Sequence, residues 1–528
     1  MMAEMNHNLT LARDVFTPRS YHEAVNCDDA DGWIAAIDEE MDAHATNGTW
    51  KLVKLPKGRR AIGSKWVFKV KIARDGTTER LKARLVARGF EQRRGLDFTE
   101  TFAPVSRMES NRLLFAVAAA RGLKLRQFDI RTAYLNGVIR KVKVYMKQPP
   151  GRDDGSGRVC LLIKALYGLK QAGREWEHML RKVLRSIGLR RCHADLCVYY
   201  MVRDTKFLIM TVSVDDLAVA HDCDELCDYV ITSLREHFVL TDLGELDWIL
   251  GMGVTRDDAT GSITIDQATY CNAVLARFQM SDVRPVATPA EPIAKDMDSP
   301  PFDDITLYRS MLGALMYLST STRPDISFAV ARAGRHSAAP TKAHFLQLKR
   351  IMRYLAGTRT LGITFHRDPN NEVKLVGYCD ADWANCSASR KSVTGNLLQV
   401  AGGPVIWTSK LQPIVALSST EAELISLTMG TQSALWCRGW LEETGNAQTS
   451  ATVMYEDNQS TISLSAHPRS YGRTKHIAAR WFFCREASER GDIEVVYLPT
   501  SEMLADMLTK PVPAAVLMRL RDKAMGNV

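Results

Sequence analysis

Apolar residues recur along the chain in three patterns, and each pattern predicts a different kind of element. Between 65 and 88, apolar and cationic residues alternate on both sides of an Asp-Gly turn, which is typical of a β-hairpin with cations in rows on one face. Apolar runs at 124–130 and 207–220 indicate buried strands. Apolar positions at helical spacing within 171–188 predict an amphipathic helix.

The same patterns predict the remaining elements of two catalytic-size modules. The further helices expected are 31–45, 106–122, 223–237, 307–319, 325–337, 342–356, 420–441, 458–466, 475–490 and 502–509. The further strands expected are 142–146, 195–203, 373–380, 393–400, 404–409, 452–456 and 493–498. Residues 285–304 contain five prolines and several acids, which indicates a linker or an extended strap between the modules.

Composition excludes several classes of protein. The 528 residues are 46% hydrophobic and 24% charged, which is ordinary for a globular chain and unlike disordered or fibrous sequences. No apolar run approaches the ~18 residues of a membrane span, and the N-terminus lacks a secretory pattern. The 11 scattered cysteines fit free thiols in a reducing compartment better than a disulfide framework. We therefore expect no membrane or secretory role.

The net charge of +9 is concentrated in one segment. Residues 51–95 hold 15 Lys and Arg against 3 Asp and Glu, a local charge of +12, whereas residues 1–50 carry −8. A cationic hairpin face suits a polyanion, because each neutralised phosphate releases counterions. The alternative interpretation is a solvated edge hairpin whose lysines discourage aggregation. The segment alone does not decide between them.

Carboxylates stand at the ends of two apolar strands in the first module. Asp215 and Asp216 interrupt the run at 207–220, and Asp129 lies near the end of the run at 124–130. An isolated Asp-Asp pair is most often turn chemistry. Three carboxylates on neighbouring strand ends, however, could hold two Mg²⁺ about 3.5–4 Å apart, the arrangement used in nucleotidyl transfer.

A second set of acids lies at element ends after residue 373. These acids are Asp380 and Asp382 after a strand, Glu421 and Glu423 at a helix start, Asp457 at a strand-to-helix junction, and Asp506 on a late helix. Singly, an acid at a helix start is more often a cap or a surface residue. One acid at each of four element ends is also what a two-metal nuclease requires.

The order of these motifs resembles the reverse transcriptase–ribonuclease H portion of a copia-type LTR retrotransposon Pol polyprotein. The resemblance runs from about Tyr21 to Pro511 and covers many motifs in one order. They are Asn47-Gly-Thr-Trp50, Lys65-Trp-Val-Phe-Lys69, Lys82-Ala-Arg-Leu-Val86, Phe102-Ala-Pro-Val105, Asp129 to Gly137, Leu166-Tyr-Gly-Leu-Lys-Gln-Ala172, Val214-Asp-Asp216, Leu243-Gly-Glu-Leu246, Leu250-Gly251 and Tyr308-Arg-Ser-Met-Leu-Gly313.

The resemblance implies a multidomain chain of α/β and α+β type. A right-hand polymerase with fingers, palm and thumb would be followed by a ribonuclease H-like mixed α/β domain with a five-stranded sheet. The expected domains are a helical N-terminal extension at 1–46, the polymerase at 47–284, a proline-led linker and helical connection at 285–370, and the ribonuclease H-like domain at 371–528.

The resemblance also implies roles for individual residues. The catalytic metal ligands would be Asp129, Asp215 and Asp216 in the polymerase, and Asp380, Glu423, Asp457 and Asp506 in the nuclease. Glu423 is preferred to Glu421 because it directly precedes the apolar Leu424 of the helix. Substrate contacts would come from Lys82, Arg84, Tyr134, Gln171, Leu250 and Gly251. Alternatively, Tyr134 is a core aromatic and Gln171 a residue of a helix N-terminus.

The implied cofactors are two Mg²⁺ per active site, with Mn²⁺ as a substitute. The implied partners are an RNA template, a DNA primer, the RNA/DNA hybrid and dNTPs, with no membrane and with the oligomeric state open. The family places the protein in the cytoplasm, in virus-like particles, with the nucleus as a second compartment.

Departures from the family pattern keep two alternatives open. Ser213 stands where the family usually has Tyr, Gly173 where it has Pro, and residues 138–143 are basic where acids are usual. The first alternative is a catalytically inactive retroelement remnant that only binds nucleic acid. The second is a nuclease with an inactive polymerase. All seven expected acids are present, which favours an active enzyme.

Overall fold

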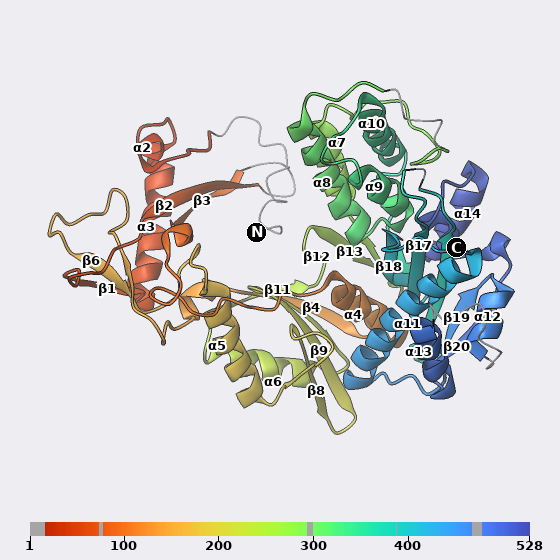
Figure 1. Cartoon of the computed structure of the whole chain (residues 1–528). Coiled ribbons are helices and arrows are strands. Elements are labelled where there is room, and N and C mark those ends of the chain that lie inside the picture. Colours follow the sequence, from red (N-terminus) through yellow and green to blue (C-terminus); the bar gives the residue numbers. More distant parts are fainter. Residues whose placement is uncertain (1–15, 73–77, 293–298, 387, 467–477, 528) are drawn as a thin grey trace.

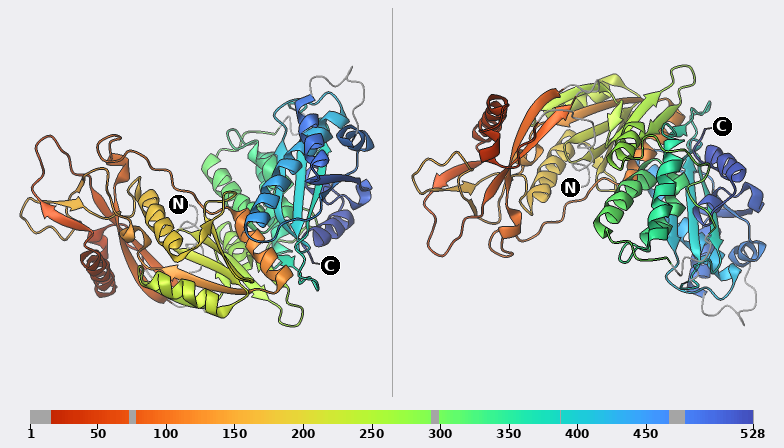
Figure 2. Two further views of the ribbon diagram at one scale, coloured as in Figure 1. Left: turned by 90° about the horizontal axis from the view of Figure 1, so that it is seen from below. Right: turned by 90° about the horizontal axis from the view of Figure 1, so that it is seen from above.

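The computed structural model describes residues 16–72, 78–292, 299–386, 388–466 and 478–527. The chain is elongated, and its N-terminal and C-terminal parts lie at opposite ends (Figures 1 and 2). The prediction of a mixed α/β multidomain chain is confirmed. In the described residues no helix is both long enough and apolar enough to span a bilayer.

The N-terminal end is built on the cationic hairpin that the alternation predicted. Strands β2 (Ser64–Ile72) and β3 (Thr78–Ala87) pair antiparallel, while the expected turn residues lie outside the described ranges. Trp66 and Phe68 pair with Leu85 and Ala83 on one face, which packs against Trp33 of helix α3 (Ala30–Asn47). Because side chains alternate along a strand, the cations are left on the other face.

Short elements connect this hairpin to the rest of the chain. Strands β1 (Trp50–Val53), β6 (Val159–Leu162) and β5 (Val144–Met146) form a three-stranded sheet that shares the core of the hairpin. The remaining short elements at this end are α2 (Tyr21–Ala24), η2 (Gly89–Glu91) and η3 (Ala133–Asn136).

A six-stranded antiparallel sheet forms the centre of the molecule, with the order β11-β4-β10-β9-β8-β7. Helices pack on both of its faces, which is why β9 reads as a continuous apolar run. Helices α5 and α6 cover one face, and helix α4 lies against the other. The bounds are β4 Lys124–Ile130, β7 Arg190–Arg191, β8 Val198–Arg203, β9 Lys206–Ser213, β10 Asp216–His221, β11 Leu240–Glu245, α4 Met108–Arg121, α5 Ala172–Ile187 and α6 Asp224–Arg235.

A four-stranded sheet and a group of helices follow. The sheet order is β12-β13-β14-β15. The last strand lies within the predicted connection, and it pairs with β14, which precedes it by about a hundred residues. The bounds are β12 Trp248–Ile249, β13 Met252–Arg256, β14 Ile263–Asp266, β15 Ile363–Phe365, α7 Ala268–Arg277, α8 Ile305–Ser321, η5 Pro324–Ile326, α9 Ser327–Gly334 and α10 Lys342–Ala356.

The C-terminal part contains a five-stranded mixed sheet with the order β18-β17-β16-β19-β20. The first three strands are antiparallel, and β19 and β20 are parallel to β16. Helix α11 packs across β16 and β17. The bounds are β16 Leu375–Asp382, β17 Val393–Val400, β18 Gly403–Leu411, α11 Ser419–Glu443, β19 Thr452–Glu456, α12 Gln459–Ala466, α13 Ala478–Glu489, β20 Ile493–Tyr497, η7 Thr500–Glu502, η8 Leu504–Leu508 and α14 Ala514–Ala524.

The helix predicted at 502–509 is wrong, and α14 was not predicted. The segment forms two short 3₁₀ pieces, and residues 504–508 are buried against β16 and β17. Short 3₁₀ turns are common where tertiary packing replaces α-helical hydrogen bonds. The apolar cores also cross the expected domain limits. One core joins α7–α10 to α14, and another joins α4 and β15 to β16–β18.

The fully buried Arg112 joins three of these regions. From the middle of α4 its guanidinium donates to Val405 O at 2.8 Å, to Thr320 O at 2.7 Å and to Ser321 O at 2.9 Å. It also lies 4.0 Å from the centre of the Trp407 ring. One side chain therefore links the central sheet, the end of α8 and strand β18.

We expect Arg112→Met to lower the free energy of unfolding by about 3–5 kcal/mol, because the carbonyls of Val405, Thr320 and Ser321 lose their donor. Urea unfolding of the full chain measures the loss. The matched control is Arg490→Met, which removes exposed ion pairs with Glu486 and Asp492 and should leave the urea midpoint nearly unchanged. Equal effects of the two substitutions would contradict the linking role of Arg112.

Candidate active sites

In the structure, the first three predicted acids lie at the same end of the neighbouring strands β4 and β10 of the central sheet. Asp216 begins β10 and lies directly opposite Asp129 in the β4–β10 register. Asp215 occupies the turn between β9 and β10, where Val214 adopts a left-handed φ of 63°. Trp176 of α5 donates its indole N–H to Val214 O at 2.8 Å, which ties this turn to the helix beneath it.

The electrostatics of Asp215 indicate crowded negative charge. Burial and the nearby Asp129 raise the pKa of Asp215, whereas Arg84 and Lys82 lower it. Two cations of the β2–β3 hairpin therefore act on the same carboxylate as the acid of β4. Oxygen ligands that repel one another in a partly dry site suit a divalent cation.

An aromatic and cationic cluster lies between the hairpin and the acids. Tyr134, on η3, contacts Tyr167 edge to face with ring centres 4.7 Å apart. The guanidinium of Arg84 lies 4.8 Å from the centre of the Tyr167 ring. Tyr134 is only partly buried and packs at the border of two cores. It is thus placed both to pack and to contact a ligand.

The other three predicted substrate contacts, Gln171, Leu250 and Gly251, lie just before a helix or in a tight turn. Gln171, just before α5, is buried and donates to Asp97 O at 2.9 Å while accepting from Gln92 at 3.0 Å, so both ends of its amide have partners within the chain. Leu250 and Gly251 form the tight turn between β12 and β13, with φ of 49° and 74°. Tyr317 of α8 donates its hydroxyl to Leu250 O and fixes this turn.

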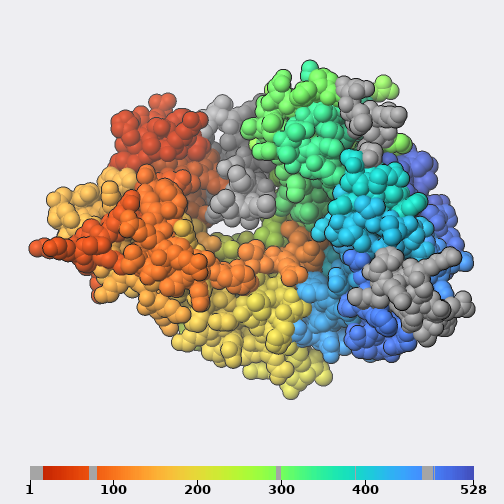
Figure 3. All heavy atoms as spheres, viewed as in Figure 1, coloured from red at the N-terminus to blue at the C-terminus, as the bar shows by residue number. Residues whose placement is uncertain are grey.

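A cationic hollow lies beside α5. It has a volume of about 950 Å³ and is lined by two aromatic rings and five cations, Phe98, Phe102, Arg94, Lys170, Arg174, Arg181 and Arg191. Glu100 and Glu177, which pair with Arg174 and Arg191, neutralise part of this charge. On the face seen in Figure 3, an opening separates the N-terminal end from the helices α7–α9. Surfaces of this charge suit a nucleic-acid backbone.

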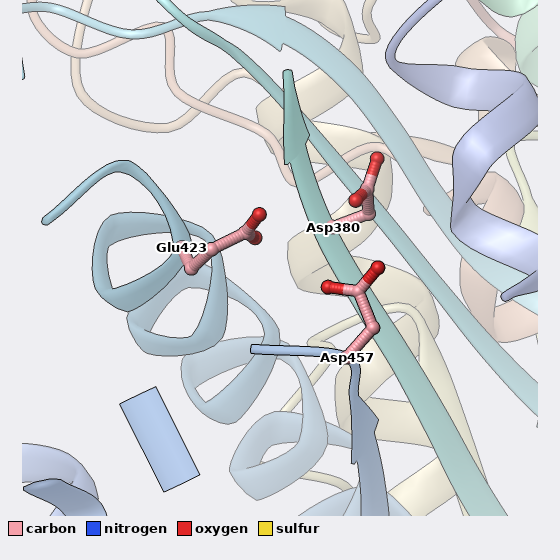
Figure 4. A group of neighbouring side chains, drawn as sticks. All are labelled: Asp380, Glu423 and Asp457. Carbon is pink, nitrogen blue, oxygen red and sulfur yellow. The ribbon is translucent and has the colours of Figure 1, made fainter. Parts of the chain in front are cut away.

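Three of the four acids predicted in the C-terminal part come together. One oxygen each of Asp380, Glu423 and Asp457 lies within 4.8 Å of the others, and the side chains point toward one another (Figure 4). Asp380 is in β16, Glu423 in the first turns of α11, and Asp457 directly follows β19. The parallel register of β16 and β19 pairs Tyr378 with Tyr455, so that residues 380 and 457 meet two positions further on.

Because these acids are buried, their ionisation costs free energy and their pKa values rise. Asp380 is 3% exposed, and burial together with Asp506 raises its pKa to about 7. Burial and Glu456 raise the pKa of Glu423 well above its ordinary value. Within the described part of the chain, Glu423 Oε2 has no hydrogen-bond partner. A buried, unpartnered carboxylate oxygen facing two further acids fits Mg²⁺.

Glu421 and Glu423 take different places on α11. Glu421 accepts a hydrogen bond from the backbone N–H of Leu417 at 2.7 Å, while its own N–H donates to Ser418 at the helix start. It therefore belongs to the cap of the helix. Glu423 faces the acid cluster, as Figure 4 shows.

Asp506 lies next to the cluster but outside the mutually close group of described acids. Its carboxylate is 2.8 Å from the ammonium of Lys510, four residues later. Thr509 donates its hydroxyl to Asp380. Burial raises the pKa of Asp506, and Lys510 opposes that shift. The segment that carries Asp506 thus supplies a cation and a hydroxyl as well as an acid.

Sequence reasoning missed Glu456 and Lys510. Glu456 is fully buried at the end of β19, accepts from Asn458 N at 3.1 Å, and has a pKa raised well above its ordinary value by burial. The strand alternation of Thr452, Met454 and Glu456 could have revealed that it faces inward. No signal of comparable strength marks Lys510.

Comparisons with known proteins cover most of the chain. Residues 47–292 match the family described as reverse transcriptase (RNA-dependent DNA polymerase). The "Retrovirus-related Pol polyprotein from transposon TNT 1-94" of Nicotiana tabacum is 38% identical over 95% of this chain and 38% of its own length. Its counterpart from transposon RE1 of Arabidopsis thaliana is 38% identical over 93% and 33%. The chain thus spans little more than a third of these polyproteins.

A shorter relative is covered almost completely. The "Putative transposon Ty5-1 protein YCL074W" of Saccharomyces cerevisiae is 31% identical over 56% of this chain and 97% of that protein. Among solved structures, the N-terminal RNase H domain of Rv2228c from Mycobacterium tuberculosis, fused to maltose-binding protein, overlaps 29% of this chain. Its identity of 11% and TM-score of 0.21 are too low to identify a fold.

The metal-free protein should lose stability as pH rises. Asp380 has a folded pKa of about 7 against an ordinary value of 3.8, so between these values the folded state holds a proton that the unfolded state releases. Melting temperatures in chelator should therefore fall from about pH 4 to about pH 7, and Asp380→Asn should flatten this slope. Identical slopes for the two proteins would contradict the assigned environment of Asp380.

Proposed function

Because the chain belongs to the reverse transcriptase family of copia-type retrotransposon Pol polyproteins, we propose that it is an RNA-directed DNA polymerase joined to a ribonuclease specific for RNA/DNA hybrids. Residues 47–284 would form the fingers, palm and thumb, preceded by a helical extension at 1–46. Residues 285–370 would be the connection and 371–528 the ribonuclease H-like domain. An RNA template, a DNA primer and dNTPs would be the partners, in a cytoplasmic particle or the nucleus.

The cross-strand placement of Asp129 and Asp216, with Asp215 in the adjoining turn, carries the polymerase proposal. These three acids would hold two Mg²⁺, or Mn²⁺ in its place. Held by these carboxylates, such ions would neutralise phosphate charge and would favour attack of the primer 3′-hydroxyl on the α-phosphate of the nucleotide. The strand pairing and the indole of Trp176 fix the carboxylates in position before substrate arrives.

The cationic hairpin would hold the triphosphate. Lys82 and Arg84 act on Asp215 from the β2–β3 hairpin, so their charges lie near the place where the nucleotide phosphates would bind. Tyr134, supported by Tyr167, would lie under the sugar and exclude a 2′-hydroxyl by size. A rigid aromatic of this kind discriminates by steric contact, which needs a fixed ring.

The remaining assigned contacts would position the two strands. Gln171 would help to hold the nucleotide after exchanging one of its present partners, Gln92 or the carbonyl of Asp97. The Leu250-Gly251 turn, held by Tyr317, would contact the primer end. The cationic hollow beside α5 favours a nucleic-acid backbone along that face.

The group formed by Asp380, Glu423 and Asp457 carries the nuclease proposal. With Asp506 these acids would hold two Mg²⁺, whose chemistry would be to activate a water and stabilise the departing oxygen of an RNA phosphodiester. The chain's own contribution is to bury the acids and fix each on a strand end or helix start. Such a site cleaves the RNA of a hybrid held against it.

An inactive nucleic-acid-binding remnant is the second candidate, and Ser213 favours it. Ser213 ends β9, pairs with Asp216 across the turn, and offers a small hydroxyl where the family usually has a large aromatic residue. A remnant would bind hybrids in a salt-sensitive way without synthesis or cleavage. Activity measurements separate the two candidates directly.

Primed synthesis tests the polymerase. With a DNA primer on an RNA template, we expect Mg²⁺-dependent dNTP incorporation that Asp215→Asn reduces by roughly 100-fold or more, because a metal ligand is lost. Hybrid cleavage by the same variant should be unchanged. No incorporation by the unsubstituted chain with either Mg²⁺ or Mn²⁺ would eliminate the polymerase proposal.

Hybrid cleavage tests the nuclease. Asp457→Asn should reduce cleavage of the RNA strand by roughly 100-fold or more while primed synthesis continues. Glu421→Gln is the matched control, since Glu421 caps α11 and does not face the acid group. Equal loss of cleavage in both variants would contradict the assignment of Asp457.

A further inference from the structure

Lys510 is a cation placed among the acids of the C-terminal site. Its ammonium is 2.8 Å from Asp506 Oδ1, and its side chain is 34% exposed while that of Asp506 is 8% exposed. Asp380 and Asp382 also act on it electrostatically. The stem of Lys510 therefore runs from solvent into a buried acidic pocket.

The ammonium of Lys510 divides the acids of the C-terminal site into two unequal groups. On one side, Asp380, Glu423 and Asp457 approach one another within 4.8 Å, and Glu423 Oε2 finds no partner among the described residues. On the other side, Asp506 Oδ1 also lacks a hydrogen bond of good geometry among the described residues, but the ammonium of Lys510 lies 2.8 Å from it as an ion pair. The first group has uncompensated negative charge, and the second group is largely neutralised.

We propose that Lys510 is a positioning residue that occupies the second cation position of the metal-free nuclease site and so makes divalent cations bind in order. The first ion would bind between Asp380, Glu423 and Asp457. The second ion would bind between Asp380 and Asp506, after the ammonium has withdrawn toward solvent. The inference rests on the proposed nuclease function.

Charge and geometry give the reason for this order. An ammonium is a compact charge on a flexible stem, so it can leave a carboxylate without moving the backbone. A divalent ion beside Asp506 would be repelled by an ammonium at hydrogen-bond distance from the same carboxylate. The second ion must therefore replace an existing ion pair, whereas the first displaces no ion pair among the described residues, only hydroxyl hydrogen bonds from Thr500 and Thr509.

A second lysine from the same region is a matched control. Lys523 of α14 is 3.0 Å from Glu502, with both side chains about half exposed, so this pair resembles the Lys510 pair in chemistry and differs in burial. It lies outside the mutually close acid group. Its removal should leave metal binding unchanged.

The experiment is a calorimetric titration of the full chain with Mg²⁺ alone, in a background with Asp215→Asn and Asp216→Asn that weakens the polymerase site. The parent should bind two ions at the C-terminal site in a tighter and a weaker step. Lys510→Gln should tighten the weaker step about tenfold and leave the tighter step unchanged, the size expected for a neighbour of a metal ligand. Lys523→Gln should leave both steps unchanged.

Lys510→Arg keeps the positive charge. It provides a second measurement if the neutral variant Lys510→Gln does not fold. The weaker step of Lys510→Arg should stay as weak as that of the parent. The proposal is overturned if Lys510→Gln changes neither step, if it changes the tighter one instead, or if Lys510→Arg tightens the weaker step. Hybrid cleavage by the same proteins tests the nuclease function separately, since ordered binding without cleavage would reject that function alone.

Discussion

The buried guanidinium of Arg112 is the contact on which the arrangement of the molecule depends. A charged group this deep is tolerated only when its donors are paired, and the accepting carbonyls come from two regions outside α4, the end of α8 and strand β18. Central sheet, α8 and β18 are therefore not independent bodies joined by a strap. Their relative positions are specified by a requirement for hydrogen bonds as well as by apolar contact, and apolar contact alone is less directional.

Both candidate sites use the same construction. Each sets carboxylates at the ends of adjacent strands, where the register brings them together, and each anchors the nearby turn or helix through a separate hydrogen bond. The sites differ in how negative charge is compensated. Cations reach Asp215 from a distant hairpin, whereas Lys510 reaches Asp506 from within one turn of chain. The compensating positive charge thus comes from a distant segment in the first site and from a neighbouring residue of the same segment in the second.

Much of the fold was predictable because its patterns are local. The alternation of 65–88 predicted the hairpin, and the apolar run of 124–130 predicted β4 with the bounds that the structure has. Pairings over long distances were not predictable in this way. Nothing in the short β15 indicates that it joins β14. The helix expected at 502–509 failed because the segment packs as short 3₁₀ pieces against β16 and β17, a distant contact that the segment itself does not reveal.

The sites show the same division between local and distant information. The acids could be named from their positions at element ends. The approach of Asp380 to Asp457 follows from a parallel register that no single segment encodes. Glu456 escaped notice because a fully buried acid, with one oxygen unpartnered among the described residues, contradicts the usual expectation for charged residues. Residues that break a local rule at a site are those that sequence reasoning tends to overlook.

Helix α4 has a consequence for synthesis on the ribosome. Residues 110–120 are buried on every side, and the carbonyl of Val405 that receives Arg112 lies 293 residues further along. At about 5–20 residues per second, this helix waits roughly 15–60 seconds for the strand that covers it. During that interval the face of α4 that packs on β18 lacks its cover, and Arg112 lacks its Val405 partner. Nascent chains truncated before β18 should therefore depend on chaperones far more than the finished protein does.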